Sequence, residues 1–195
     1  MTALRFLGIS GSLRAGSFNT AALRAAIELK PNDVTFELAS IRDIPIYDDD
    51  VRATGMPASV VALQSRIAAA DAVVIATPEY NYSVPGVLKN AIDWVSRTDP
   101  QPFVDKPVAI LGASPGMIGT ARAQYDLRKM FVYLDGHVLN KPELMIGSAH
   151  ARFDKDGRLT DEATRGFIAA MLQALRAWTL RLRLGRLDRE SGAAA

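Results

Sequence analysis

The chain has 195 residues, 49% of them hydrophobic and 23% charged, a balance typical of one globular α/β domain with a sizeable core. It contains no cysteine, which excludes disulfides, thiolate nucleophiles and iron–sulfur ligation, and its two isolated histidines give no indication of a metal site. A net charge of +2 without aromatics among the basic residues argues against nucleic-acid binding. We expect a cytoplasmic protein, because neither a signal-peptide pattern nor an apolar run near about 18 residues is present.

The first predicted strand, residues 4–9, is apolar apart from Arg5 and leads into a loop of hydroxyl residues and glycines at residues 10–20. Apolar residues at helical spacing follow over residues 21–29, so the loop connects a strand to a helix N-terminus. Free N–H groups and a partial positive charge make that end of a helix a good phosphate site. Because Arg14 is its only full charge, the loop is suited to one phosphomonoester. A plain turn that caps the helix is the alternative.

Two other phosphate-binding loops do not match this segment. Gly11 and Gly16 have the spacing of a Walker loop, but Ser17 stands where an NTPase needs lysine. A dinucleotide fingerprint needs G-x-G-x-x-G and an acidic residue at the end of the second strand. The predicted second strand, residues 34–38, instead runs into Ala-Ser-Ile at residues 39–41. The loop therefore predicts a mononucleotide.

The longest irregular connection is predicted at residues 42–57, which contain Pro45, Gly55 and a run of three aspartates. It either borders the active site or a subunit boundary, or is a plain surface loop. The third predicted strand, residues 71–77, comes later in the chain and leads into a second informative loop.

This second loop, Thr-Pro-Glu-Tyr-Asn-Tyr-Ser-Val-Pro-Gly at residues 77–86, is expected to lie beside the first. In an open parallel sheet the first and third strands flank the point where strand order reverses, and ligands bind outside their carboxyl ends. A flat heteroaromatic ring needs backbone N–H and C=O groups at its edge and a planar neighbour over its face, and residues 78–82 offer both. Alternatively, Tyr80 and Tyr82 are surface or interface aromatics.

A helix is predicted over residues 83–97, with Ser83 as its cap and a proline in its first turn. On this helix Trp94 is either a core residue or part of a subunit contact. The fourth predicted strand, residues 108–112, ends in a glycine-rich loop at residues 113–119. Three loops then converge on one crevice.

The pattern continues with a helix at residues 120–134, a fifth strand at 137–145 and a last helix at 161–184. The last helix has an apolar stripe expected to pack on the sheet, made of Phe167, Ile168, Met171, Leu172, Leu175, Trp178 and Leu182. The arginines at its end are interpreted as a solvated face: Arg176, Arg181, Arg183, Arg186 and Arg189. Residues 186–195 are expected to form a flexible tail. We therefore predict an α/β fold over residues 1–195, a flavodoxin-like three-layer sandwich with a five-stranded parallel sheet in the order 2-1-3-4-5.

Several motifs carry a family resemblance. They are Gly-Ser-Leu-Arg-Ala-Gly-Ser-Phe-Asn at residues 11–19, the second loop, and Leu-Lys-Asn-Ala-Ile-Asp-Trp at 88–94. This pattern closely resembles the NADPH-dependent FMN reductase family, and within it the chromate and quinone reductases. The likeness also takes in residues 119–125 and 140–143 and covers roughly residues 4–146, whereas the C-terminal fifth is only loosely similar.

The resemblance implies FMN as cofactor and NADPH as co-substrate in a ping-pong cycle, with no catalytic acid or base from the protein. The implied cofactor-binding residues are Ser10, Ser12, Arg14, Ser17, Phe18 and Asn19 in the first loop, Pro78, Glu79, Tyr80, Asn81 and Tyr82 in the second, and Ser114 and Gly116 in the third. The N–H groups of residues 114–119 are expected to stabilise negative charge on the reduced ring. Glu79 is expected to serve loop structure, because a carboxylate against an anionic flavin is unfavourable.

The implied electron acceptors are small molecules: quinones, chromate, azo or nitro compounds, ferricyanide or free flavin. A flavodoxin-like electron carrier and a flavin-based redox sensor are the alternatives, and both are expected to oxidise NADPH poorly. Candidates for binding the NADPH 2′-phosphate are Arg14, Arg97 or an arginine of a neighbouring subunit. The resemblance also implies a homo-oligomer, a dimer or a tetramer, with contacts through Arg122, Tyr125 and Glu143.

Overall fold

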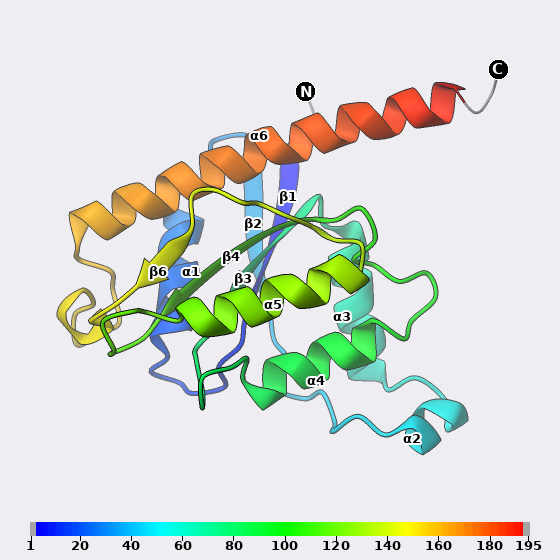
Figure 1. The fold of residues 1–195 in the computed structure, drawn as a ribbon, viewed down its shortest axis with the longest axis horizontal. Helices are drawn as coiled ribbons and strands as arrows, with labels where there is room; N and C mark the ends of the chain where they lie inside the picture. The colour runs from blue at the N-terminus through cyan, green and yellow to red at the C-terminus, as the bar shows by residue number, and fades with distance from the viewer. Residues whose placement is uncertain (1–2, 193–195) are drawn as a thin grey trace.

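The computed structural model describes the backbone of residues 3–192 and the side chains of residues 3–185. Its centre is a parallel sheet in the order β2-β1-β3-β4-β5 (Figure 1), so the predicted strand order is confirmed. The four long strands are β1 (Leu4–Ser10), β2 (Val34–Ala39), β3 (Ala72–Ala76) and β4 (Pro107–Ala113). All of their pairings are parallel, so their carboxyl ends share one edge.

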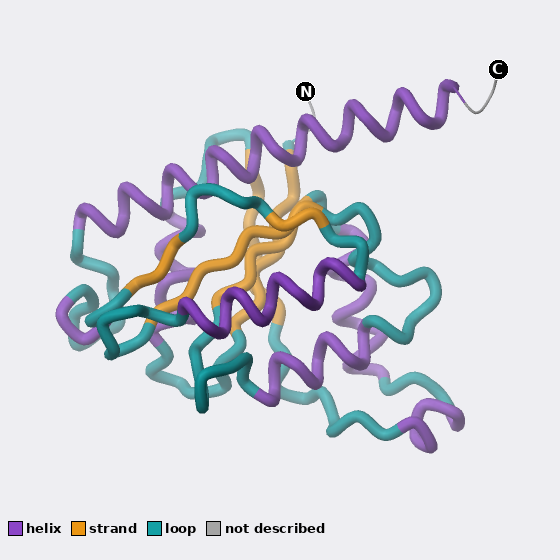
Figure 2. The backbone as a smooth tube through the Cα atoms, in the orientation of Figure 1, coloured by secondary structure: helices purple, strands orange, loops and turns teal. Residues whose placement is uncertain are grey.

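Helices cover both faces of the sheet, which gives the three layers that the sequence predicts (Figure 2). One face is covered by α1 (Phe18–Glu28) and α6 (Glu162–Gly192), and the other by α3 (Ala58–Ala69), α4 (Gly86–Val95) and α5 (Ala121–Tyr133). Strand β1 shows the alternation: Leu4 and Phe6 belong to the core under α1 and α6, whereas Leu7 and Ile9 belong to the other core. Burial on both faces explains why the strands are almost continuously apolar.

The fifth strand is not continuous, so the prediction of one strand over residues 137–145 is wrong. Two short strands occupy the position, β5 (His137–Val138) and β6 (Leu144–Ile146), and both pair with β4. Pro142 lies between them, and its missing N–H removes a donor that a continuous ladder needs.

The connection at residues 42–57 is also more ordered than expected, because it contains the short helix α2 (Asp49–Thr54). The carboxylate of Asp48 caps this helix by accepting from the N–H of Asp50 at 2.9 Å. The connection is fastened to α4 through the carbonyl of Pro45, which accepts from the indole of Trp94 at 2.8 Å. Trp94 is fully buried, which settles its role as a core residue.

Helix α4 begins without the cap expected from Ser83. Pro85 occupies the N-cap position and makes no side-chain cap. The hydroxyl of Ser83 instead donates to the carboxylate of Asp126 on α5 at 2.9 Å. Hydrogen bonds from Lys129 and then Ser83 hold the pKa of Asp126 below its usual value. Ser83 therefore ties the second loop to the neighbouring helix.

Helix α6 differs from expectation in three respects. Its stripe is buried at Ile168, Met171, Leu172 and Leu175, but Phe167 is 59% exposed and points away from the core. Two of its arginines form ion pairs with aspartates that directly precede strands: Arg176 with Asp33 before β2, and Arg183 with Asp71 before β3. These two arginines are therefore not simply part of a solvated face. The helix continues to Gly192, so the backbone in part of the segment expected to form a tail is helical. Residues 193–195 and the side chains of Arg186 and Arg189 lie outside the described residues.

Over residues 3–192, none of the helices combines the length and the apolar character needed to cross a membrane. Among the side chains of residues 3–185, no three His, Cys, Asp or Glu side chains lie together in a way that could hold a metal ion.

Candidate functional site

The first loop leaves β1 at Ser10 and enters α1 at Phe18, at the carboxyl edge of the sheet. Ser17 caps the helix: its Oγ accepts from the N–H groups of Asn19 at 3.2 Å and Thr20 at 3.4 Å. Because Oγ acts as acceptor in both bonds, the hydroxyl proton of Ser17 is not used in the cap and can be donated to a ligand. The loop thus presents a hydroxyl donor at a helix N-terminus, where an anion is favoured.

The first two loops lie side by side, as predicted. The N–H of Gly11 donates to the carbonyl of Ala76 at 2.8 Å, so the loops begin at the same level of the sheet. A Cβ atom added at Gly11 would lie 3.0 Å from Leu88 and 3.2 Å from Pro78, which leaves room for little more than glycine. Such a close approach explains why glycine follows the first strand.

Asn19 fastens the first loop to the third. Its side-chain amide donates to the carbonyl of Ala113 and accepts from the N–H of the same residue, both at 2.9 Å. Asn19 is 3% exposed, so both of these polar atoms are satisfied inside the protein. The end of β4 is thereby held against the start of α1.

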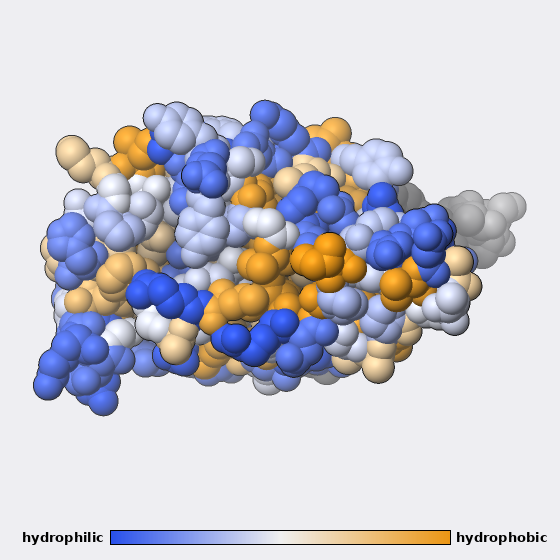
Figure 3. Space-filling view, turned by 90° about the horizontal axis from the view of Figure 1, so that it is seen from below, coloured by the Kyte–Doolittle hydropathy of each residue, from blue (hydrophilic) through white to orange (hydrophobic). Residues whose placement is uncertain are grey.

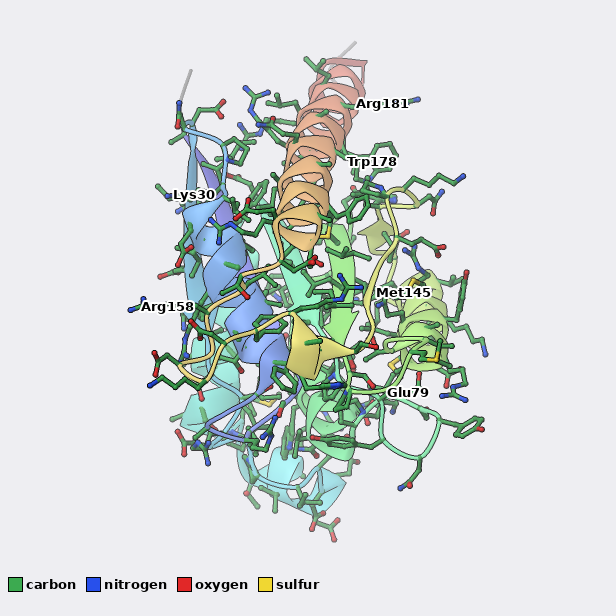
Figure 4. The ribbon with its side chains drawn as sticks, turned by 90° about the vertical axis from the view of Figure 1, so that its left-hand side faces the viewer. Lys30, Glu79, Met145, Arg158, Trp178 and Arg181 are labelled. Atoms are coloured by element: carbon green, nitrogen blue, oxygen red, sulfur yellow. The ribbon has the colours of Figure 1, made fainter. Side chains whose placement is uncertain are left out.

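The second loop is held on α5 by Glu79 (Figure 4). The carboxylate of Glu79 accepts from the backbone N–H of Arg122 at 3.0 Å and of Ala123 at 3.2 Å, at the positive end of the α5 dipole. Its other oxygen accepts from the guanidinium of Arg122, and this hydrogen bond raises the pKa of Arg122 above its usual value. The charge of Glu79 is therefore compensated within the protein, and its side chain supports the loop.

A tight turn carries the tyrosines of the second loop. Tyr80 and Ser83 exchange two backbone hydrogen bonds of 3.1 Å around Asn81 and Tyr82. Both central residues are left-handed, with φ of 51° and 70°, as a type I′ turn requires. The guanidinium of Arg122 lies over the ring of Tyr82, 3.6 Å from its centroid. Tyr82 is held in this way although it is 71% exposed.

The third loop, residues 114–119, uses most of its N–H groups internally. The N–H of Ser114 donates to Ile146 at 3.0 Å, that of Gly116 to the hydroxyl of Ser114 at 3.0 Å, and that of Gly119 to Gly116 at 3.3 Å. Proline at residue 115 has no N–H. Within this loop the N–H groups of Met117 and Ile118 remain available to donate to a ligand. The prediction that the N–H groups of residues 114–119 stabilise the reduced ring is therefore narrowed to these two.

A cavity of about 130 Å³ lies where the three loops meet. Nine of the predicted site residues line it: Ser12, Arg14, Ser17, Phe18, Asn19, Pro78, Glu79, Tyr80 and Ser114. Four others do not: Ser10, Asn81, Tyr82 and Gly116. Ser10 shares a hydrogen bond of 2.8 Å with the hydroxyl of Thr20. The cavity is also lined by Ala113 and Pro115, which the prediction missed although their place directly after the fourth strand was a usable signal.

Seen from the end of the molecule at which β1 terminates, hydrophobic residues gather near the middle of the surface and hydrophilic residues surround them (Figure 3). A polar cavity with a helix N-terminus, hydroxyls and an arginine can take a phosphate, and the exposed loops beside it can take a flat ring. The fold and site together define a mononucleotide-binding protein of the flavodoxin-like class.

The comparison with known families is specific. The model of the NADPH-dependent FMN reductase family matches residues 4–151, and the chain belongs to that family. Family membership confirms the class predicted from the sequence, an oxidoreductase that uses FMN with NAD(P)H.

Similar proteins extend over nearly the whole chain. An NAD(P)H-dependent FMN reductase of Pseudomonas aeruginosa is 58% identical over 92% of this chain and 97% of its own. A quinone reductase of Escherichia coli is 46% identical over 93% of this chain and 98% of its own. Among solved structures, the flavoenzyme NAD(P)H:(acceptor) oxidoreductase FerB of Paracoccus denitrificans has a TM-score of 0.83 and 38% identity, over 92% of this chain and 98% of that one.

The three residues expected at contacts between subunits all have partners within their own chain. Arg122 pairs with Glu79, as described above. The hydroxyl of Tyr125 lies 3.4 Å from a carboxylate oxygen of Glu143, and Arg128 lies 3.9 Å from the other.

Proposed function

We propose that the protein transfers electrons from NADPH through FMN to quinone-type acceptors in a ping-pong cycle. The observation that carries the proposal is the single cavity in which residues of all three predicted loops meet. The family membership and the quinone reductase relatives support the same reaction class. Bound FMN would supply the hydride and electron transfer, so the protein needs no acid or base of its own.

The donor set of the cavity fits the phosphate of FMN. Ser12, Arg14 and Ser17 offer two hydroxyls and one guanidinium beside the first turn of α1. Glu79 also lines the cavity, but its carboxylate is bonded to Arg122 and two backbone N–H groups and does not oppose an anion as a free charge would. Arg14 is exposed and near the ring of Phe18, 5.7 Å from its centroid. In this proposal Arg14 neutralises the phosphate.

The second and third loops would hold the ring. Residues 78–80 line the cavity wall and lead into the turn that presents Tyr82 at the rim. The N–H groups of Met117 and Ile118 are placed on an exposed segment of the third loop, where they can donate to the polar edge of the ring. Asn19 acts indirectly, because it fixes the distance between the first and third loops.

In this proposal, the broad range of electron acceptors follows from the exposure of the second and third loops. Met117 is 90% exposed and Tyr82 is 71% exposed, so the loops around the ring form an open rim. We propose that quinones are reduced here, and that chromate, azo and nitro compounds or free flavin can reach the same face. A cytoplasmic location and a homo-oligomer that includes the surface around Arg122, Tyr125 and Glu143 belong to this proposal.

The test is anaerobic mixing of the FMN-loaded protein with NADPH while the flavin absorbance band is followed. Rapid bleaching, reversed by a quinone, is the expected result. Tight FMN binding without bleaching would contradict the reductase and favour an electron carrier or a redox sensor. A Ser17→Ala variant should lose affinity for FMN by about fivefold to thirtyfold while its affinity for riboflavin, which lacks the phosphate, stays the same.

A further inference from the structure

A second cavity adjoins the proposed FMN site on the side of β2. It has a volume of about 310 Å³ and is lined by the first loop, the first turns of α1 and the residues that follow β2. The two cavities share Ser12 and Arg14, so they lie on either side of the same loop. A volume near 300 Å³ is at the small end of the range for ligand sites and suits part of a nucleotide.

The lining of this cavity is basic. It contains the guanidinium groups of Arg14, Arg24 and Arg42 and no acidic side chain. All three arginines are exposed, and over residues 3–185 no carboxylate forms an ion pair with any of them. Several other arginines of the chain do have such partners, Arg176 with Asp33 among them. Arg14 also borders the first cavity, where it neutralises the FMN phosphate in the proposed function, so Arg24 and Arg42 are the positive charges that favour a second anionic ligand here.

Arg42 is held in place at this cavity. Its guanidinium donates to the carbonyl of Leu13, and its backbone N–H donates to the hydroxyl of Ser40 at 3.1 Å. A guanidinium has five N–H donors, so one bond to a carbonyl leaves others for a ligand. Apolar side chains of Leu13, Leu38 and Ile41 form the rest of the wall and can contact a flat base.

The position at the end of β2 indicates what the ligand is. In dinucleotide-binding sheets, an acidic residue at the end of the second strand binds the ribose 2′-hydroxyl of NAD, whereas an arginine accommodates the 2′-phosphate of NADP. Here β2 ends at Ala39 and is followed by Ser40 and Arg42, with no carboxylate in the lining. The arrangement has the chemistry for a phosphate on the ribose.

We propose that this second cavity, formed by Arg24, Arg42 and Ser40 beside the first loop, binds the adenosine 2′-phosphate of NADPH. The inference rests on the proposed function, since it assigns a place to the co-substrate of that reaction. Arg42 and Arg24 then determine the preference for NADPH over NADH. Two arginines were named from the sequence as candidates for binding the 2′-phosphate. Arg14 borders this cavity. Arg97 does not line it and lies over the ring of Tyr47, a residue of the connection that follows β2, at 5.1 Å from the ring centroid.

The decisive experiment is calorimetric titration of the protein, saturated with FMN, with adenosine 2′,5′-bisphosphate, its 3′,5′ isomer and adenosine 5′-monophosphate. We expect the 2′,5′-bisphosphate to bind at least about tenfold more tightly than either of the others. Arg42→Gln and Arg24→Gln should each reduce that preference by about tenfold, and Arg42→Lys should keep part of it. Excess FMN keeps the first cavity filled, so binding there cannot imitate the result.

The matched control is Arg181→Gln, which removes one positive charge from an exposed position on α6, at the opposite end of the molecule from Glu79 (Figure 4). It should leave the preference unchanged. The inference is overturned if the wild type does not distinguish the three nucleotides, if both Arg24→Gln and Arg42→Gln keep the full preference, or if Arg97→Gln alone removes it. Each of these outcomes leaves FMN binding and flavin bleaching by NADPH intact, whereas failure of the proposed function removes one of those two signals.

Discussion

The carboxylate of Glu79 accepts hydrogen bonds from Arg122 twice, from its backbone N–H at 3.0 Å and from its guanidinium Nε at 2.6 Å. The side chain of Glu79 is only 6% exposed, so its carboxylate is largely removed from water. Through this pair the second loop is fixed to the first turn of α5, and the same guanidinium covers the ring of Tyr82. One carboxylate therefore sets the position of the loop that borders the proposed flavin site.

Replacing Glu79 by alanine should weaken both the fold and the site. The N–H groups of Arg122 and Ala123 would lose their acceptor, so we expect the free energy of unfolding to fall by about 1 to 3 kcal/mol. FMN affinity should fall as well, because the turn at residues 80–83 loses its anchor. Urea unfolding and flavin fluorescence titration measure the two effects. Glu37→Ala, which removes an exposed carboxylate paired with Arg66 at 3.3 Å, is the control and should change stability by less than about 1 kcal/mol.

The left-handed backbone of Tyr82 gives a second prediction. With φ at 70°, a residue with a Cβ atom is strained there, whereas glycine is not. Tyr82→Gly and Tyr82→Ala both lose the contact with Arg122, so the difference between them isolates the backbone effect. We expect the glycine variant to be more stable than the alanine variant by about 1 kcal/mol in urea unfolding. Equal stabilities would show that the turn relaxes away from the type I′ geometry.

The sequence predicts the architecture well because each strand, and the loop that follows it, is marked by a short continuous stretch of residues. Each strand is buried on both faces and is therefore a short apolar run, and each loop at a carboxyl end begins where that run stops. The parallel arrangement of the sheet follows from the alternation of strands and helices. The break in the fifth strand was also visible at Pro142, but the apolar residues on either side of it favoured one continuous strand.

Features that depend on contacts distant in sequence were not predictable. Ser83 has the position of a helix cap, yet its hydroxyl bonds Asp126, which lies far along the chain. Asn19 belongs to the first loop by its motif, but its amide is committed to Ala113. The second cavity depends on three arginines from separate elements. No sequence motif indicates this cluster of arginines, because only folding brings them together.

The reciprocal pair between Asn19 and Ala113 yields a further prediction. In Asn19→Asp the N–H of Ala113 keeps its acceptor, but the carbonyl of Ala113 then faces a carboxylate oxygen in place of a donor. The new charge also lies beside the proposed phosphate site. Because this polar group is buried, we expect the free energy of unfolding to fall by about 1 to 3 kcal/mol, and FMN affinity to fall more than riboflavin affinity. Equal losses for the two ligands would show that Asn19 acts only on the loop and that its charge does not reach the phosphate.

The start of α6 makes stability depend on pH. Asp161 accepts from the hydroxyl and the N–H of Thr164 and from Arg152, and these hydrogen bonds, the hydroxyl's above all, hold the pKa of Asp161 below its usual value of 3.8. Arg152 also donates to the carbonyl of Gly147 at 2.8 Å, so Asp161 supports the segment that packs on the third loop. A carboxyl with a lowered pKa in the folded state stabilises the fold above its ordinary pKa, and this contribution is lost as the pH falls through the lowered value.

We therefore expect Asp161→Ala to be less stable than the wild type at pH 7 and the difference to narrow as the pH falls below about 4. Urea unfolding of both proteins at a series of pH values measures this difference. Asp156→Ala is the control, because the side chain of Asp156 is exposed. That variant should follow the wild type over the whole range. A gap between Asp161→Ala and the wild type that stays constant down to about pH 2 would mean that the charge of Asp161 contributes nothing and that only its packing is lost.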